Sequence, residues 1–516
     1  MRATSLPLPT LHAGLTRRGL AALFAVATVT CATVTCCTPT TVSAMDGLSL
    51  IPHFEQFVLT QPNPKTKKGK AATKSTEVEI DPALKRDKTA LPPGYKIPPE
   101  KLPDVDVKKE IPIPAKVTDS KAEGYKEWRA HLDKMKQYKD LLRKGNFTDA
   151  KLEREKLRYG IKYKLAKMTQ LGILFPSDED REKVQKVQVD GKKPEAPESI
   201  GAIRDDLLGD LKDTNAFNGG MEIRDAFLDL LCEEGPKLFD NNYYVRFNIA
   251  LLLSTINNRD QDKIKGINDD VPCFKALRPL LDLVNDPKQH PMYKVHPVQA
   301  LARMCRNKNC STDDRFAIIE SLIKQMAGAK TQPEWYGWRL AENLAMLGDP
   351  NDRTRQPVVV TALVNVLKDA GFSYRIRSQA AHSLGRIPLE GFRKTDEIAI
   401  EMLRLGEQMA LEYEKSKTNS MWKLYFTYLY LGFQPRDAVE RAEKKGLLLQ
   451  VESKPALVST KAVVTEAYQH FLPLAQNVLG GRASAPIPDQ LRKIKVWLDG
   501  KGKPGAPGNP LAKDGK

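Results

Sequence analysis

The sequence predicts an all-α protein, built from stacked helix pairs and preceded by an export signal and a basic arm. From residue 119 onward, apolar residues recur at spacings of three and four, which is the period of an amphipathic helix. One helical pattern, in which an apolar residue and Arg precede a small pair, returns along the chain. The first 44 residues contain no Asp or Glu and carry an apolar run, as secretory signals do.

The N-terminus has the layout of a cleavable signal peptide. Arg17 and Arg18 precede an apolar run over Leu20–Val34, and small residues lead to an expected cut between Ala44 and Met45. The run is too short for a membrane span of about 20 apolar residues. We therefore expect an exported protein of bacterial type, in the periplasm, the cell envelope or the secreted space, with no transmembrane segment after cleavage. A retained anchor is the alternative, and the paired arginines leave the general secretory and twin-arginine routes open.

The positive charge is concentrated outside the predicted helical body. The formal net charge of the chain is +17. Residues 61–118 carry +5, residues 119–170 carry +7 and the tail 482–516 carries +5, so that the rest of the mature chain is close to neutral. An anionic surface or polymer would therefore be bound by these flanks, the basic arm above all, rather than by the body.

Residues 45–118 predict a disordered linker. Most of it is dense in Pro and Lys and poor in aromatic residues, and proline fixes φ and removes a backbone donor. Stretches such as Ile111-Pro112-Ile113-Pro114 favour extended polyproline II structure. A second linker is expected at 176–199, which is again polar and rich in Pro and Gly.

Residues 119–175 predict a charged helical hairpin. The members of one apolar face are Tyr125, Trp128, Leu132, Met135, Tyr138 and Leu142, and Gly145-Asn146 separates the two helices. We expect the pair to pack on the helices that follow with its charges in solvent, and a grip on nucleic acid or another polyanion is the alternative. The repeats beyond it are expected to bury their faces against one another, without help from the arm.

Residues 200–415 contain the repeated pattern. In one copy Val245-Arg246 is followed by Ile249-Ala250, and in another Ile376-Arg377 is followed by Ala380-Ala381 at the same spacing. Looser copies of the second helix lie at Val295–Met304 and Trp338–Gly348. The expected first helices lie at Phe274–Val284, Phe316–Met326, Val358–Leu367 and Ile398–Met409. An isolated pair cannot bury its apolar stripe, so neighbouring pairs must stack.

This pattern resembles the second helix of a HEAT repeat over about residues 218–412. The resemblance implies an armadillo-type fold, a right-handed α-α superhelix or solenoid, with a long surface for protein–protein interaction. Arg246 and Arg377 are then expected to link adjacent repeats through Asp or backbone carbonyls. Ala380 and Ala381 are expected to let neighbouring helices approach closely.

Residues 416–481 predict a helical cap that closes the C-terminal end of the repeats. The run MWKLYFTYLYLGF is strongly aromatic, and aromatic residues at helical spacing are most often core, although a ligand groove is the alternative. The residues expected in that core are Trp422, Tyr425, Phe426 and Tyr430. Residues 482–516 are expected to form a basic tail.

The sequence contains no catalytic motif of the kinds sought: no nucleophile elbow, no phosphate-binding glycine loop, no HExxH and no haem attachment site. We therefore assign no catalytic residue, cofactor or metal. His290, His296, Cys305 and Cys310 have residue types that suit zinc, but their spacings fit no common finger or ribbon. For Cys305 and Cys310, a small loop disulfide and free or differently paired thiols are the other interpretations.

Four cysteines remain after signal cleavage, in a compartment expected to be oxidising. They are Cys232, Cys273, Cys305 and Cys310. Four thiols allow three pairings, and the sequence does not choose among them.

Together these observations favour a non-enzymatic, protein-binding scaffold of the cell envelope or secreted space. A repeat body offers a long surface, and the chain lacks a catalytic cluster. The sequence does not indicate the partner protein. Two alternatives stay open: a polyanion-binding protein that acts through its basic flanks, and an accessory subunit or lyase of an enzyme, which the resemblance to HEAT-like proteins would allow.

Overall fold

The computed structural model shows a mostly helical chain, as the sequence predicts. It describes residues 110–170, 173, 199–214, 221–260, 270–392, 394–480 and 486–501. Within these ranges the only sheet is a two-stranded ribbon of β1 (Asn257–Arg259) and β2 (Val271–Pro272). No helix among these residues has both the length and the apolar character needed to cross a membrane. The expected signal peptide, its cut between Ala44 and Met45, and most of both linkers lie outside the described residues.

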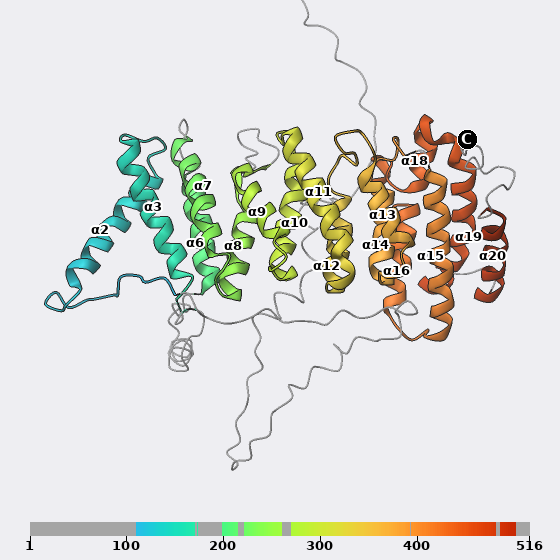
Figure 1. The fold of residues 1–516 in the computed structure, drawn as a ribbon, viewed down its shortest axis with the longest axis horizontal. Helices are drawn as coiled ribbons and strands as arrows, with labels where there is room; N and C mark the ends of the chain where they lie inside the picture. The colour runs from blue at the N-terminus through green and yellow to red at the C-terminus, as the bar shows by residue number, and fades with distance from the viewer. Residues whose placement is uncertain are drawn as a thin grey trace, which may run out of the picture. The chain divides into compact units, whose positions relative to one another are not determined.

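Most of the helices fall into two series of neighbours, in which each helix contacts the next one of its series (Figure 1). The first series consists of α3 (Ala150–Lys167), α7 (Glu222–Glu234), η5 (Phe274–Ala276) with α9 (Leu277–Asn285), α11 (Thr312–Gly328), α13 (Val358–Lys368) and α15 (Thr395–Lys415). The second series consists of α6 (Ile200–Asp213), α8 (Tyr243–Thr255), α10 (Pro291–Arg306), α12 (Glu334–Leu344), α14 (Tyr374–Arg386) and α16 (Met421–Phe433). Each helix from α9 to α16 also contacts its partner in the other series: α9 contacts α10, α11 contacts α12, α13 contacts α14 and α15 contacts α16. The two helices of each predicted pair are therefore in contact.

The remaining helices lie at the two ends of these series or connect them. At the N-terminal end is α2 (Tyr125–Leu142), and at the C-terminal end are α17 (Ala438–Ala442), α18 (Leu447–Ser453), η7 (Pro455–Thr460), α19 (Lys461–Leu479) and α20 (Ile487–Lys501). Short 3₁₀ turns, η4 (Gly235–Leu238) and η6 (Ala329–Thr331), follow α7 and α11.

Side-chain caps fix where the repeated helices begin. Asn242 Oδ1 accepts from the Val245 N–H at 3.1 Å, and Ser373 Oγ accepts from the Ile376 N–H at 3.4 Å. Both caps therefore stand three residues before the apolar-Arg pair of the repeat. Ser311 caps α11 in the same way, with its Oγ 3.1 Å from the Asp314 nitrogen.

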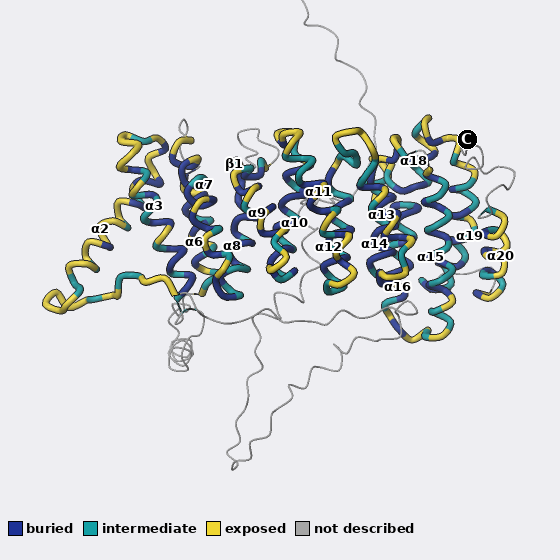
Figure 2. The backbone as a smooth tube through the Cα atoms, viewed as in Figure 1, coloured by how far each residue is buried: buried dark blue, intermediate teal, exposed yellow. Residues whose placement is uncertain are grey.

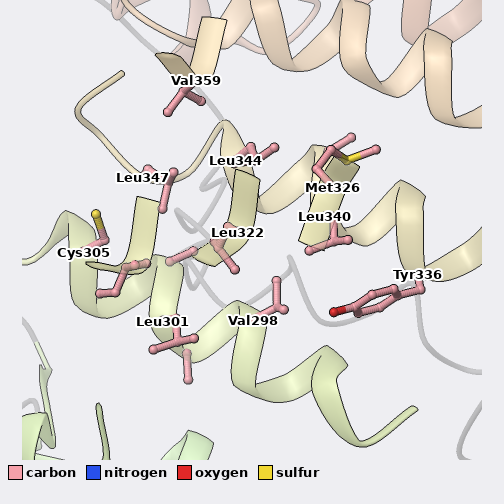
Figure 3. Close-up of a cluster of buried hydrophobic side chains, with 14 of the residues drawn as sticks. Val298, Leu301, Cys305, Leu322, Met326, Tyr336, Leu340, Leu344, Leu347 and Val359 are labelled. Carbon is pink, nitrogen blue, oxygen red and sulfur yellow. The ribbon is translucent and has the colours of Figure 1, made fainter. Parts of the chain in front are cut away.

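The core is made where helices of both series meet, and Figure 3 shows one such cluster. Val298 and Leu301 of α10, Leu322 of α11, and Leu340 and Leu344 of α12 are at most 1% exposed. Full burial of one such side chain is worth about 1.5–3 kcal/mol. Figure 2 shows the same arrangement along the helices, with buried positions on the sides that face neighbouring helices.

The predicted aromatic core at the C-terminal end is largely present. Trp422 and Phe426 are 0% exposed and Tyr425 is 4% exposed, whereas Tyr430 is half-buried beneath Arg436. The basic tail, however, begins with a helix. Ile487, Ile494 and Leu498 of α20 are buried, because this helix packs on α15 and α19.

The hairpin is fixed to the body by a buried charge cluster. Asp210 of α6 is 1% exposed and accepts hydrogen bonds from the Tyr138 hydroxyl, from Lys139 Nζ at 2.5 Å and from Lys164 Nζ. Lys164 is 4% exposed and also pairs with Asp206. On the other side of the hairpin, α3 contacts α7. The hairpin therefore packs on α6 and α7, the helices that follow it. That the repeats bury their faces without help from the arm stays a prediction.

The predicted apolar face of α2 is buried in part: Tyr138 and Leu142 are 0% exposed. Leu132 is 41% exposed, and Trp128 and Met135 are only partly buried. The innermost positions of α2 are His131, Tyr138, Leu141 and Leu142. The face follows the contacts with α3 and α6, which the helical period alone does not specify.

The end of the first linker is tied to the hairpin. Residues 110–118 form no helix, in line with their proline content. The Ile111 N–H donates to Thr169 Oγ1 at 2.9 Å, and Gln170 Nε2 donates to the Ile111 carbonyl at 2.6 Å. The described end of the linker is thus held beside the C-terminus of α3.

Helices α14 and α16 approach each other closely. A Cβ added at Gly432 would lie 2.5 Å from the Ala381 carbonyl oxygen and 2.8 Å from Met402 Cε, and one added at Gly385 would lie 2.3 Å from the Gly432 carbonyl oxygen. Ala380 and Ala381 are 0% exposed. Small side chains at this contact let the two backbones meet.

Gly432→Ala is expected to lower stability, because the new methyl group would overlap backbone that cannot move aside. Overpacking of this kind costs about 1–3 kcal/mol, which exceeds the gain of about 1 kcal/mol that Ala brings to a helix. Ala381→Phe should cost at least as much. Gly209→Ala, in α6, is the control: a Cβ there meets nothing within 4 Å, so only the propensity gain remains. Urea unfolding of the three variants measures these effects, and a stable Gly432→Ala protein would contradict the packing.

Asp210→Ala is expected to be strongly destabilising, because it leaves the buried ammonium of Lys164 without its main partner. Removing one partner of a buried ion pair costs about 3–5 kcal/mol. Arg129→Ala is the matched control, since Arg129 and Asp133 are both exposed and 3.9 Å apart, and it should change stability by less than about 0.5 kcal/mol. Equal denaturant midpoints for the two variants would show that the hairpin does not depend on the cluster.

Candidate functional site

Aromatic and cationic side chains follow one another along the second series, and Trp338 of α12 lies among them. Its indole Nε1 donates to Gln379 Oε1 of α14 at 2.9 Å. Gln379 is 2% exposed and its amide donates to Ser383 Oγ at 3.3 Å, which in turn donates to the Ala341 carbonyl at 2.7 Å. This chain of hydrogen bonds fixes the indole across the α12–α14 contact.

Two guanidinium groups lie over the indole of Trp338. The Cζ atoms of Arg339 and Arg375 are 4.3 Å and 4.6 Å from the ring centroid. Arg339 donates to Glu342 at 2.7 Å, and Arg375 is 4.0 Å from Glu334. Such cation–π contacts contribute about 0.5–2 kcal/mol each. They hold both guanidinium groups in place, while the hydrogen bonds to described residues use few of the N–H donors that each group carries.

A third ring and an imidazole continue the site onto α14 and α16. The ring of Tyr428 stacks on Trp338 with centroids 6.5 Å apart and on His382 with centroids 5.9 Å apart. Burial, with a smaller contribution from Arg386, lowers the pKa of His382 to about 3. His382 is therefore a neutral, stacked imidazole at neutral pH.

Further members lie on the preceding helices of the same series. His296 of α10 meets the ring of Phe247 of α8 edge-on, with centroids 5.5 Å apart. Burial, with smaller contributions from Arg339 and Arg204, lowers the pKa of His296 to about 4. Arg204 of α6 donates to Asn248 Oδ1 at 3.3 Å. Neighbouring helices of the second series, from α6 to α16, thus each contribute to one continuous set of side chains.

We call this set the aromatic–arginine row. Its members are Arg204, Phe247, His296, Trp338, Arg339, Arg375, His382 and Tyr428. All of them are partly exposed, so each can reach another molecule. Three buried polar atoms in or beside the row lack a hydrogen-bond partner in the described part of the chain: Glu334 Oε1, Arg375 Nε and His382 Nδ1.

The row is equipped for binding. Its rings can stack on side chains or peptide planes, and its guanidinium groups can donate to carbonyl and carboxylate oxygens. The two carboxylates beside it, Glu334 and Glu342, already face arginines.

A hollow lies on the first series, between α11 and α13. It has a volume of about 450 Å³ and is lined mainly by apolar side chains such as Met326, Val366 and Phe372. The Lys330–Asp369 ion pair stands beside it, with Lys330 over the ring of Phe372. It lacks the successive aromatic and arginine groups of the row.

The repeat arginines named from the sequence bond to backbone carbonyls. Arg377 Nε donates to the Leu367 carbonyl, at the end of α13, at 2.9 Å. Arg246 donates to the Asn241 carbonyl and to Gln289 Oε1 at 3.3 Å, just before α10. Val245 and Ile376, the apolar residues that precede them, are at most 1% exposed. These residues stabilise the helix pairs and stand apart from the row.

The four residues weighed for zinc are not brought together. His290 caps α10, with its Nδ1 3.2 Å from the Met292 nitrogen, while His296 faces Phe247. Cys305 and Cys310 are both buried, and each is a free thiol in this structure. Across the described residues no group of three or more His, Cys, Asp or Glu side chains could hold a metal ion. The loop disulfide of Cys305 and Cys310 stays a prediction.

Part of the basic surplus of the hairpin is engaged by the body. Lys139 and Lys164 pair with acidic groups of α6, and Arg158 donates to Glu233 at 2.6 Å and to Glu234 at 2.9 Å on α7. An aromatic group of Trp128, His131, Tyr159 and Tyr163 lies on the same hairpin, with Lys134 Nζ 4.8 Å from the Tyr159 ring centroid. An anionic ligand would have to bind exposed cations of the hairpin such as Lys134, rather than the cations that pair with the body.

Sequence reasoning missed the row because its members belong to six different helices. The one indication in the sequence was Arg339, which stands one position away from where the repeat pattern places its arginine. The structure gives the reason: Arg339 lies over Trp338 and pairs with Glu342, whereas Arg246 and Arg377 turn to backbone carbonyls.

Protonation of the buried imidazoles predicts acid sensitivity. A folded pKa of about 3 for His382 lies below its unfolded value of 6.5, so the unfolded chain binds more protons and stability falls as pH drops below 6.5. His382 alone would remove at most about 2 kcal/mol between pH 7 and pH 5. Urea unfolding of His382→Gln should show a correspondingly smaller loss over this interval. An unchanged pH dependence would contradict the burial of the imidazole.

The chain matches no family model, no curated protein and no solved structure in the comparisons made with each. The function of the row must therefore be argued from its own geometry.

Proposed function

We propose that the protein is a non-enzymatic scaffold that binds a partner protein along the aromatic–arginine row. The observation that carries the proposal is the succession of stacked rings and guanidinium groups on consecutive helices of the second series. Trp, Tyr and Arg are the residues most enriched at the energetic centres of protein interfaces. A row that is already held by internal contacts loses little side-chain entropy on binding.

The chemistry of the row favours an extended polypeptide segment as the bound element. Peptide carbonyls and side-chain carboxylates can accept from Arg339 and Arg375, and aromatic or apolar side chains can stack on Trp338 and Tyr428. Because the row crosses several helices, an extended chain can contact them in turn. In this proposal the two helix series form a HEAT-like solenoid, and an exported chain would present the row in the cell envelope or secreted space.

Polyanion binding through the basic flanks is the competing proposal. It differs in its salt dependence: phosphate contacts weaken steeply between about 50 and 200 mM salt, whereas stacking on the row should change little. The same binding measurement at two salt concentrations therefore separates the two functions.

A photo-reactive amino acid at Tyr428 should crosslink the partner in native envelope fractions. The same probe at Leu411, which is 48% exposed on α15, is the control on the first series and should not crosslink it. Once the partner is identified, Trp338→Ala should weaken binding by roughly 30-fold, equivalent to about 2 kcal/mol. Trp497→Ala, on α20, is the matched control. Equal crosslinking from both positions, or full affinity in Trp338→Ala, would exclude the row as the binding face.

A further inference from the structure

The N-terminal arm joins the described chain beside the first helix of the aromatic–arginine row. Two hydrogen bonds hold Ile111 just after the C-terminus of α3. At the same end of α3, Lys164 pairs with Asp206 of α6, which stands two residues after Arg204, the first member of the row. In Figure 1 the blue segment before α2 reaches the end of α3 that lies beside α6. The arm that precedes residue 110 therefore starts at the α6 end of the row.

The last part of the arm differs from the rest in composition. Residues 91–109 contain five prolines, and their four lysines stand against three acidic groups, which leaves a net charge of +1. Residues 61–90 contain three prolines and carry +4. Prolines favour the polyproline II helix, which has three residues per turn. Glu100, Pro103 and Asp106, at spacings of three, would then share one face with two carboxylates and a proline ring.

The row has the groups that such a face requires. Aromatic-lined grooves bind polyproline II segments, whose shape is formed before binding, and the rings of Trp338 and Tyr428 stack with centroids 6.5 Å apart. Guanidinium groups pair with carboxylates, and Arg339 and Arg375 both lie over Trp338. The same arginines would repel the more cationic residues 61–90. Charge and shape therefore favour residues 91–109 as the occupant.

The length of this segment also fits the row. From α6 to α16 the second series takes five steps between contacting helices, which amount to about 40–50 Å. A polyproline II chain rises about 3.1 Å per residue, so residues 91–109 extend over about 59 Å. Counted from residue 110, Glu100 lies about 31 Å along such a chain. Helices α12 and α14 are three and four steps from α6, at about 24–40 Å, so Glu100 comes within reach of Arg339 and Arg375.

We propose that residues 91–109 of the same chain dock along the aromatic–arginine row as a polyproline II segment, with Glu100 at Arg339 and Arg375. The inference rests on the proposed function, because it requires the row to bind an extended polypeptide. The docked arm covers the row until the partner protein displaces it. The apparent Kd of the partner is then raised by the inverse of the fraction of molecules whose row is uncovered. The protein thus carries its own competitor for the partner.

Photo-crosslinking within the purified chain, without its expected signal peptide, tests the docking and its direction. Benzoylphenylalanine in place of Tyr95 should crosslink to α14 or α16, and the same probe in place of Val107 should crosslink to α6 or α8. The products should be monomers at every protein concentration, because the segment belongs to the same chain. Dimeric products, which would identify a second copy as the occupant, would overturn the proposal, as would crosslinks that avoid the second series.

A labelled peptide of residues 91–109 tests the competition. On the unmodified chain the peptide competes with the tethered segment, and Glu100→Lys in the chain weakens that competitor. The peptide should therefore bind the Glu100→Lys chain about threefold more tightly, or better. Glu79→Lys makes the same charge change outside the segment and should leave the affinity unchanged. Equal affinities for all three chains would show that the arm does not cover the row.

These outcomes can be told apart from failure of the proposed function. If the probe at Tyr428 captures a partner in envelope fractions but the arm does not crosslink in the purified chain, the row binds a partner without an internal competitor. If the arm crosslinks as expected but Trp338→Ala leaves the affinity for the partner unchanged, the row serves the arm alone. The first result overturns this inference, and the second overturns the proposed function.

Discussion

The burial of each helix's apolar face against the next helix is the constraint on which the structure depends. A pair such as α11 and α12 covers only part of its own stripe, and Leu322 and Leu340 become fully buried because α10 and α13 complete the cluster. Contacts between neighbouring helices therefore stabilise the chain locally. The same contacts fix the relative rotation of the helices, so that a set of partly exposed side chains can line up across α6 to α16.

Close helix packing and the aromatic–arginine row are two consequences of one arrangement. Gly432 and Ala381 bring α16 against α14, and this approach places Tyr428 of α16 between Trp338 and His382. A wider spacing would separate the rings. The stability of the repeats and the geometry of the proposed binding face therefore rest on the same small residues.

The parts of the fold set by local sequence were predictable, and the parts set by distant contacts were not. The helical class and the repeated helices follow from apolar spacing and from caps such as Asn242 and Ser373, which act within a few residues. The contact of Lys164 with Asp210 joins residues 46 positions apart across a segment of polar sequence, and no periodicity indicates it. The helix α20 was assigned to a basic tail because charge was counted over the whole segment, although Ile487, Ile494 and Leu498 have helical spacing.

The site was less predictable than the fold. The search for reactive groups at fixed sequence spacing considered His290, His296, Cys305 and Cys310, which the fold keeps apart. Trp338, Arg375 and Tyr428 meet only because α12, α14 and α16 are neighbours.

The two ends of the helix series are unlike, and this determines how the protein could change in length. At one end α2 and the ion cluster around Asp210 present a charged hairpin, while at the other the rings of Phe426 and Phe433 pack on Phe471 of α19. Neither end could accept a further helix pair without the loss of its own contacts. A pair duplicated or deleted between α9 and α14 would leave both ends intact and would lengthen or shorten the row by one helix. Evolution or engineering could thus adjust the reach of the proposed binding face in steps of one helix pair, from the middle of the chain outward.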